Sequence, residues 1–458
     1  MRRPFLVALI ALWLSGCGPA PRPTPTPPVE VDAGVEPGPD LSGVPGRAPT
    51  AREHEAMRRL MRVAESIRSL RFETDVPFRV QDRPTITQFV RDQIDAEDLE
   101  RARVFYVAVG LLPPDLAVDE LIVRVLGEQI VGYYDPDRGL MVVREDVATE
   151  LGGSGRGQRQ LGEAEMVLVH ELVHALQDQR LELGRHYEEE RTIDGENAFA
   201  MVVEGDATLA MIGHMVSQQG QPLRALTRNV GMLRMLIRSS PDAVQGQEME
   251  SAPPIIRLPL VARYLDGMVF CASLHGQRGW NGVDHAHRHP PVSTEQVLHP
   301  DRYADDERPD EILLPALPEL GAAGLEQHEE DSLGELEMGI WFGLGVPTEE
   351  RDESAAEGWS GDRLRVYTDP ANGGATSVVW FTAWDDEGEA AEAETAARAV
   401  TATLAASARQ PAHVERRGRA VLVLLDLAPA LKEPVRAAFD AFAAGLPSTP
   451  PSARESGD

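Results

Sequence analysis

The stretch that decides the fold is Met166-Val-Leu-Val-His-Glu-Leu-Val-His-Ala-Leu-Gln-Asp178. Its apolar residues recur at helical spacing, which predicts a helix over about 161–183. His170 and His174 are four residues apart, so on a helix they project from one face, one turn apart. Two imidazoles placed in this way can share one zinc ion.

Glu171 adds the chemistry that a bare metal site lacks. It follows the first histidine, about 100° around the helix, so its carboxylate can reach a metal-activated water without being a ligand. Such a carboxylate can act as the general base. The neighbouring residues Leu172, Val173, Ala175 and Leu176 are apolar. A buried helix is therefore expected, and burying two histidines and a glutamate without a role is costly.

A catalytic zinc site also needs a third protein ligand, with one position left for water. A second long helix is predicted over about 192–216, and it contains Val202-Val-Glu-Gly-Asp-Ala207. We expect Glu204 to be the third ligand, because it is a carboxylate among apolar residues. Gly205 beside it would let the two predicted helices approach closely.

Other acidic residues and one histidine of this second helix compete with Glu204. The competing carboxylates are Asp194, Glu196 and Asp206. Asp206 could instead orient a ligand histidine, as could Asp178, one turn beyond His174. His214 lies about 80° away from the Glu204 face and is the weaker candidate.

An HExxH motif followed by a glutamate on the next helix resembles the gluzincin branch of zinc peptidases, although the gap from His174 to Glu204 is longer than in thermolysin-like enzymes. Over roughly residues 55–310 the chain also resembles uncharacterised bacterial exported HExxH proteins. The resembling stretches are Glu128-Gln-Ile-Val-Gly-Tyr-Tyr-Asp-Pro136, His170-Glu-Leu-Val-His-Ala-Leu-Gln-Asp-Gln179, Val203-Glu-Gly-Asp-Ala-Thr208 and Pro290-Pro-Val-Ser-Thr-Glu-Gln-Val-Leu-His-Pro300.

The resemblance implies an α+β chain with a zincin-like, mostly helical metallopeptidase domain over 51–320. It also implies Zn²⁺ as cofactor and a peptide or protein as substrate. A hairpin is predicted over 130–144, and its strand Leu140–Arg144 is the expected sheet edge beside the metal helix. Candidate donors to an oxyanion are Tyr264, His299 and Tyr303.

The C-terminal region has a different character. Alternating strand-like and Ala-rich helical stretches predict a smaller α+β domain over 331–446, without a recognisable catalytic constellation. Residues 447–458 are expected to be a disordered tail. The formal net charge of −30 argues against nucleic acid as a partner.

The N-terminus predicts export and a lipid anchor. Arg2 and Arg3 precede a short apolar run that ends at Leu14-Ser-Gly-Cys17, which resembles a bacterial lipoprotein signal. We expect a signal peptide over 1–16, lipidation of Cys17 and a Pro-rich disordered tether over 17–50. Residue Gly18 after the cysteine suggests the outer membrane, facing the periplasm.

Two rival interpretations remain open at this point. The chain could be a non-catalytic, zinc-binding envelope lipoprotein that acts as a partner-binding module. It could also be a zinc hydrolase that acts on a non-peptide bond. The second cysteine, Cys271, lies in an apolar setting and is expected to be a buried small side chain rather than a nucleophile.

Overall fold

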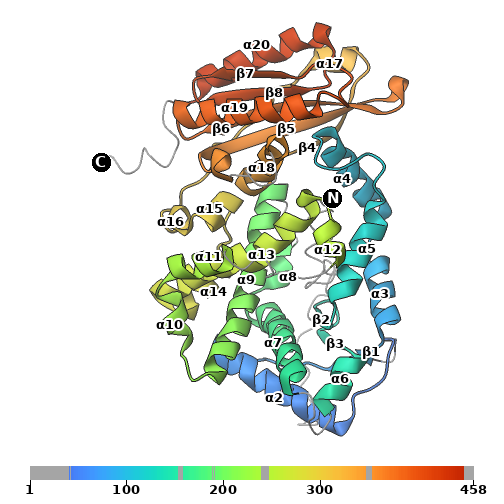
Figure 1. Ribbon diagram of the computed structural model, residues 1–458, viewed down its shortest axis with the longest axis vertical. Helices are drawn as coiled ribbons and strands as arrows, with labels where there is room; N and C mark the ends of the chain where they lie inside the picture. Colours follow the sequence, from blue (N-terminus) through green and yellow to red (C-terminus); the bar gives the residue numbers. More distant parts are fainter. Residues whose placement is uncertain are drawn as a thin grey trace, which may run out of the picture.

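The computed structural model describes residues 41, 43–152, 158–187, 189, 191–238, 247–346 and 353–447. These residues form a mostly helical first part with a small sheet and a second part built on a larger sheet (Figure 1). The expected mixed α+β class is confirmed. The predicted signal peptide with Cys17, and residues 448–458 of the predicted tail, lie outside the described residues.

The first part contains one three-stranded sheet and fifteen of the described helices. They are α2 (Ala51–Arg68), β1 (Phe78–Gln81), α3 (Arg83–Asp92), α4 (Ala96–Ala108), α5 (Val118–Gln129), β2 (Gly132–Asp135), β3 (Leu140–Arg144), α6 (Glu145–Gly152), α7 (Gln158–Arg180), α8 (Leu183–Tyr187), α9 (Ile193–Gln218), α10 (Leu223–Thr227), α11 (Val230–Arg238), α12 (Gln247–Ser251), α13 (Pro254–Arg278), α14 (Trp280–Arg288), α15 (Thr294–Leu298) and α16 (Pro300–Ala304).

The predicted hairpin is present as β2 and β3, but the expected edge strand is wrong. The strand order is β1-β3-β2, because β1 pairs in parallel with the far side of β3. Strand β3 is therefore central, β1 and β2 are the two edges, and β2 is the edge that packs against α7. The sequence did not show that Phe78–Gln81 would supply this second partner for β3.

Residues at the end of the expected tether belong to the fold. Arg47 forms an antiparallel bridge to Val80, with N–H···O distances of 2.9 and 3.0 Å. Thr50 then caps α2, and Glu53 completes a capping box that satisfies two backbone N–H groups.

Helices α7, α9 and α13 form the centre of the first part. A Cβ atom built at Gly205 of α9 would lie 2.1 Å from the carbonyl carbon of Gly267, so α9 and α13 touch backbone to backbone. Gly205 does permit a close approach, but to α13 rather than to the histidine-bearing helix α7. Helix α9 is long and apolar enough to cross a membrane, yet 78% of its most apolar window is buried, as in the core helix of a folded domain.

The sequence over 253–259 carries Pro253, Pro254 and Pro259, which predict a break before residue 260, but α13 runs through this stretch. Pro254 occupies the first turn, where its missing N–H would have no partner in any case. Pro259 lies inside the helix and is buried. The packing of α13 against α9 supports the helix through this point.

The second part begins at α17 (Pro318–Ala322), so the expected boundary at residue 320 lies inside a helix. Its other elements are β4 (Glu326–Asp331), α18 (Gly334–Phe342), η1 (Gly343–Gly345), η3 (Glu353–Ala356), β5 (Trp359–Asp369), η4 (Pro370–Asn372), β6 (Ala375–Trp384), α19 (Glu387–Leu404), β7 (His413–Arg417), β8 (Ala420–Leu425) and α20 (Pro429–Gly445). The sheet order is β4-β5-β6-β8-β7, and all neighbours are antiparallel.

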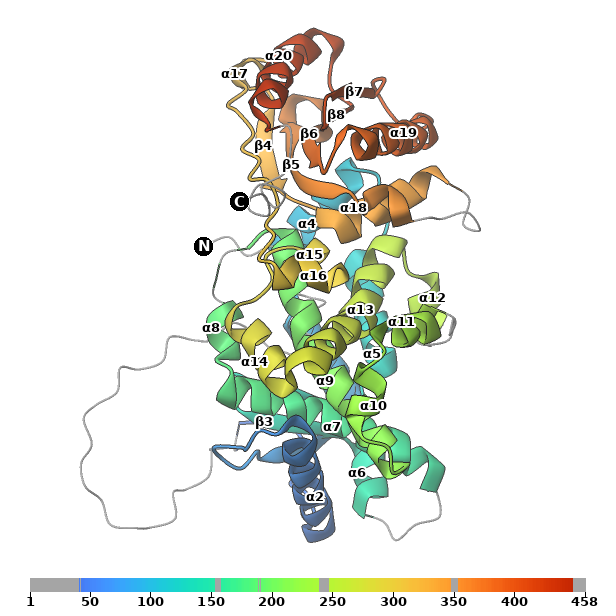
Figure 2. The same cartoon turned by 90° about the vertical axis from the view of Figure 1, so that its left-hand side faces the viewer.

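Helices cover both faces of the larger sheet. Figure 2 shows α17 and α20 on one side and α19 on the other. The layer with α19 is continuous with the core of the first part through α18: the Trp341 indole N–H donates to the carbonyl of Val109, at 2.9 Å. The two parts therefore share one hydrophobic core.

Candidate metal centre

Helices α7 and α9 bring three expected ligands together. The Nε2 atoms of His170 and His174 are 3.0 Å apart, and Glu204 Oε2 lies 3.2 Å from the first and 3.5 Å from the second. All three side chains are buried. In the described part of the chain, these three are the His, Cys, Asp or Glu side chains whose ligand atoms lie close enough together, all within 4.8 Å of one another, to hold one metal ion.

These separations fit a tetrahedral zinc ion. Nitrogen and oxygen ligands bind zinc at about 2.0–2.2 Å, which places two tetrahedral ligand atoms about 3.3 Å apart. The measured separations of 3.0, 3.2 and 3.5 Å lie around that value. Two imidazoles and one carboxylate are also a donor set of catalytic zinc sites, which keep a fourth position for water.

The charge of the three side chains favours a cation between them. Burial raises the pKa of Glu204, but the imidazoles of His174 and His170 outweigh this effect and lower the pKa to about 2. Burial lowers the pKa of His174, but the Glu204 carboxylate raises it to about 9. Burial lowers the pKa of His170. The carboxylate thus attracts one positive charge, which a metal ion can supply in place of a proton.

Glu171 lies beside the three ligands without joining them. Its Oε2 accepts a hydrogen bond from the backbone N–H of Tyr134 in β2, at 3.1 Å. Tyr134 lies opposite Met141 of β3. The N–H of Met141 donates to the carbonyl of Pro77 on the β1 side, so Tyr134 and Met141 are a non-hydrogen-bonded pair and the N–H of Tyr134 faces away from β3. Burial raises the pKa of Glu171 to about 8.

A glutamine that the sequence analysis missed fixes the ring of His174. Gln177 Nε2 donates to the carbonyl of Val203 at 3.0 Å and to Asp206 Oδ2 at 2.9 Å. Its Oε1 must therefore accept from His174 Nδ1, at 2.8 Å. This tautomer leaves the lone pair of His174 Nε2 free for a metal. The i,i+3 spacing from His174 was the available sequence signal.

Asp206 supports the centre through Gln177 and is not a ligand. It is fully buried and also accepts from Arg68 Nε at 2.6 Å and His287 Nε2 at 2.9 Å. Burial raises its pKa, but the charge of Arg68 and the hydrogen bonds lower it well below the usual range. Arg68 and His287 come from α2 and α14, and nothing in their local sequence marks them.

The other candidates of the second helix lie away from the ligands. Asp194 Oδ1 accepts from the N–H and hydroxyl of Thr294, at 2.8 and 2.6 Å. Glu196 is nearly buried near Asp331, and burial raises its pKa to about 8. His214 pairs with Gln218, at 2.8 Å.

Asp178, the other expected orienting carboxylate, forms its described hydrogen bond with Tyr134 rather than with a candidate ligand histidine. Its Oδ2 accepts from the Tyr134 hydroxyl, at 2.8 Å. Tyr134 therefore holds α7 twice, through its backbone N–H to Glu171 and through its hydroxyl to Asp178.

The three candidate oxyanion donors are separated by the fold. Tyr264 of α13 stacks on the His170 ring, with 5.8 Å between centroids and 27° between planes. His299 pairs with Glu335, and the Tyr303 hydroxyl donates to the carbonyl of His289. Of the three, Tyr264 is the one whose described contacts include a candidate metal ligand.

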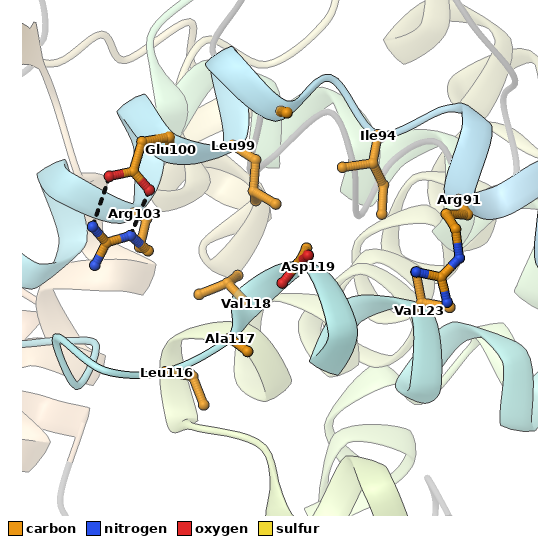
Figure 3. A pocket seen from close by; sticks show the side chains of 11 residues that line it. Arg91, Ile94, Leu99, Glu100, Arg103, Leu116, Ala117, Val118, Asp119 and Val123 are labelled. Atoms are coloured by element: carbon orange, nitrogen blue, oxygen red, sulfur yellow. Dashed lines mark hydrogen bonds and ion pairs between the residues drawn. The ribbon is translucent and has the colours of Figure 1, made fainter.

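A cavity of about 400 Å³ lies elsewhere, between α4 and α5 (Figure 3). Its Arg103 is held by both oxygens of Glu100, at 2.6 and 2.7 Å. Arg91 and Asp119 carry opposite charges at its exposed rim. None of the metal-centre residues lines this cavity.

The fold and the site define a mixed α+β protein with a buried His/His/Glu centre suited to a metal. Residues 323–430 match a protein family described as a domain of unknown function (DUF8575). The match covers β4 to the start of α20 and does not include the metal centre. No curated protein and no solved structure matches the chain.

Proposed function

We propose that this protein is a zinc metallopeptidase of the gluzincin type with a zincin-like first part. The observation that carries the proposal is the convergence of His170, His174 and Glu204, with Glu171 beside them and outside the ligand set. A bound zinc ion would lower the pKa of a water molecule and polarise a substrate carbonyl.

Glu171 is the general base of the proposed reaction. In the metal-free site burial raises its pKa to about 8, and the charge of a bound zinc ion would lower it, so that the group is ionised and can accept a proton near neutral pH. The carboxylate takes a proton from the attacking water and later delivers it to the leaving amine. The N–H of Tyr134 holds one of its oxygens in place during both transfers.

Two further features support a peptide as substrate. The edge strand β2 runs beside α7, and because the outward N–H of Tyr134 already donates to Glu171, an extended peptide would add to this edge through the remaining outward backbone groups. Tyr264 lies beside His170, and burial raises the pKa of its hydroxyl, which therefore remains a donor for a developing oxyanion.

The proposed location is the cell envelope, outside the cytoplasm. Cys17 would carry the lipid, and the Pro-rich stretch after it would hold the folded part away from the membrane. Labelling of the expressed protein with a fatty-acid analogue tests this point, because Cys17→Ser should abolish the label.

The test of the activity compares wild type with Glu171→Gln and Glu204→Ala, each expressed without its signal peptide. We expect one equivalent of zinc in wild type and in Glu171→Gln, with a loss of peptide cleavage of about 10²–10⁴-fold in the latter. Glu204→Ala should lose metal affinity. Glu182→Gln on the exposed stretch after α7 is the matched control and should behave as wild type.

The possible outcomes separate the rival functions. Wild-type protein that binds no zinc would overturn the proposal. Zinc without cleavage of a peptide library would favour the partner-binding module, and cleavage of esters alone would favour a non-peptide hydrolase.

A further inference from the structure

A stretch of the chain around α10 and α11 carries only positive charge. Residues 207–241 contain four arginines and no aspartate or glutamate, although the chain has 74 acidic residues among 458. The stretch covers the end of α9, then α10 and α11. In a chain with a net charge of −30, a segment of this kind creates a local surface of opposite sign.

The neighbouring segment of α13 and α14 has the same character at its surface. Over 267–294 the one acid is Asp284, which is buried and lies 2.5 Å from a guanidinium nitrogen of Arg68. The exposed side chains of this segment that can carry charge are all basic: Arg278, His285, Arg288 and His289. Burial lowers the pKa of His285, and the positive charges of the other three lower it further, so these side chains lie close together.

The fold brings these two segments side by side. The Thr227 hydroxyl and His275 Nδ1 are 3.1 Å apart, which joins α10 to α13. A Cβ at Gly279 would lie 3.7 Å from a guanidinium nitrogen of Arg224, so Arg224 lies at the turn between α13 and α14. Both views place α10, α11 and α14 on one side of the molecule, the left in Figure 1 and the side turned to the viewer in Figure 2.

Four exposed arginines define this surface, and we call them the basic patch: Arg224, Arg228, Arg278 and Arg288. Within the part of the chain that the structure describes, none of them forms an ion pair. An exposed arginine without a carboxylate partner keeps its full capacity to bind an anion, and its planar guanidinium suits a phosphate group. The basic patch therefore favours an anionic partner.

Two exposed methionines lie beside the basic patch. Met232 and Met235 of α11 are 53% and 62% exposed and, three residues apart, share one face of the helix. Leu233 on another face is buried in the core, so the helix is held in place with the methionines outward. Arg228 of the basic patch precedes this helix by two residues. Exposed apolar side chains next to basic ones are typical of a helix that lies in a membrane interface.

Acidic side chains limit this surface at its margins. Arg234 points about 130° away from the midpoint of the two methionines and lines a small cavity with Asp266 and Glu357, so these two acids face another side of α11. On the neighbouring helix α16, Asp301 is exposed, and the exposed Asp305 follows it. The positive surface is therefore confined to α10, α11, α14 and the end of α13, and it can set one orientation of the protein on a charged partner.

We propose that the basic patch, together with Met232 and Met235, docks the protein onto an anionic lipid bilayer. The arginines bind lipid phosphate groups, and the methionines enter the apolar layer beneath the headgroups. Nucleic acid also offers phosphate groups but has no apolar layer to receive the methionines. The surface orients the folded part on the membrane, and it requires neither the proposed peptidase activity nor a lipid on Cys17.

The test measures binding to lipid vesicles by co-sedimentation. The protein is the chain without its signal peptide, with Cys17→Ser so that no lipid is attached. We expect binding to mixed phosphatidylglycerol and phosphatidylcholine vesicles that weakens as the salt concentration rises, and little binding to phosphatidylcholine alone. Arg224→Gln/Arg228→Gln should lower the vesicle affinity by about fivefold per arginine. No binding of wild type to the anionic vesicles would overturn the proposal.

The control removes two arginines from the opposite side of the molecule. Arg91 of α3 and Arg124 of α5 are exposed, and Figure 1 places both helices at the right, away from α10 and α11. Arg91→Gln/Arg124→Gln has the same net charge as the patch variant and should bind anionic vesicles like wild type. Equal losses of affinity in the two double variants would reflect net charge alone and would overturn the assignment of the patch.

A further variant separates a bilayer from an acidic protein partner. Met235→Ser removes an exposed apolar side chain without changing the charge, and it should weaken vesicle binding several-fold because less apolar surface enters the bilayer. Soluble poly-glutamate is the competing probe. Vesicle binding that Met235→Ser leaves unchanged, or tighter binding of wild type to poly-glutamate than to the anionic vesicles, would overturn the bilayer and identify an acidic polypeptide as the partner class.

Discussion

At the residue scale, Gln177 orients His174, one of the three proposed metal ligands. Gln177→Leu removes the acceptor for His174 Nδ1 and the amide that donates to Asp206. Loss of such an orienting partner typically costs 10–100-fold in metal affinity, and we expect a loss of about that size. A competition titration against a zinc chelator measures it.

A glutamine on the same helix provides the control for this prediction. Gln179 accepts from the backbone N–H of Glu73 and lies on another face of α7. Gln179→Leu should leave the metal affinity unchanged. Equal affinity in both variants would show that His174 does not need Gln177 for its orientation.

Tyr264 gives a kinetic prediction. Removing one donor to an oxyanion costs about 10²–10³ in kcat, so Tyr264→Phe should lower kcat by roughly that factor with little change in KM or in zinc content. Tyr303→Phe is the control, because its hydroxyl donates to the carbonyl of His289. If both variants cleave peptides at the wild-type rate, the donor lies elsewhere.

At this scale the sequence alone predicted the three side chains that converge but not their surroundings. His170, His174 and Glu204 were identified because helical spacing and apolar neighbours mark them locally. Gln177 had a local signal that was not used. Arg68 and His287 reach Asp206 from helices far away in the chain, and no local pattern encodes such a contact.

At the element scale, the backbone contact between α9 and α13 positions Glu204. A Cβ at Gly205 would lie 2.1 Å from the carbonyl carbon of Gly267 and 2.2 Å from its oxygen, so Gly205→Ala forces the helices apart. Overpacking typically costs about 1–3 kcal/mol, and a backbone clash belongs at the upper end of this range or above it. Urea unfolding should show this loss, and the metal affinity should fall with it.

A glycine with open space around it is the matched control. Gly162 lies in α7, and among the described residues no atom outside its own helix backbone is within 4 Å of the position its Cβ would take. Gly162→Ala should therefore stabilise the protein by about 0.5–1 kcal/mol through helix propensity. A stabilising effect of Gly205→Ala would contradict the observed contact.

The elements themselves were largely predictable, because periodicity is a local property. The hairpin, α7 and α9 lie near their expected positions, and the strand-like stretches Leu364–Tyr367, Ser377–Trp384 and Ala420–Leu425 predict β5, β6 and β8. The sequence pattern over 86–109 predicts one helical stretch, but the structure has two helices there, because the Asp95 side chain caps a new helix by accepting from the N–H groups of Glu97 and Asp98. Strand order was not predictable, because it depends on partners distant in sequence.

At the scale of the whole molecule, buried acids at the junction of the two parts make the stability depend on pH. Burial raises the pKa of Asp194 and Asp331 to about 7 and that of Glu337 to about 8. In the unfolded chain these groups return to ordinary values near 4. Between about pH 4 and pH 8 the folded state therefore binds more protons than the unfolded state.

The sign of the effect follows from this proton balance. Stability contributed by the protonated acids is complete below about pH 4 and is lost as the pH rises through 7 to 8, by at most about 1.4 kcal/mol per pH unit for each group.

Glu337→Gln should reduce this slope, because glutamine stays neutral and its oxygen can still accept from Tyr106 and Asn197. Denaturant unfolding of metal-free protein between pH 5 and pH 8 measures the slope. The proposed metal ligands are the same in wild type and variant, so their titration cancels in the difference between the two slopes. Glu53 is the control: the Arg47 hydrogen bonds lower its pKa to about 2, so Glu53→Gln should shift the stability without changing the slope in this pH range. A Glu337→Gln slope equal to that of wild type would mean that this carboxyl is already ionised in the folded protein, so that the junction tolerates its charge.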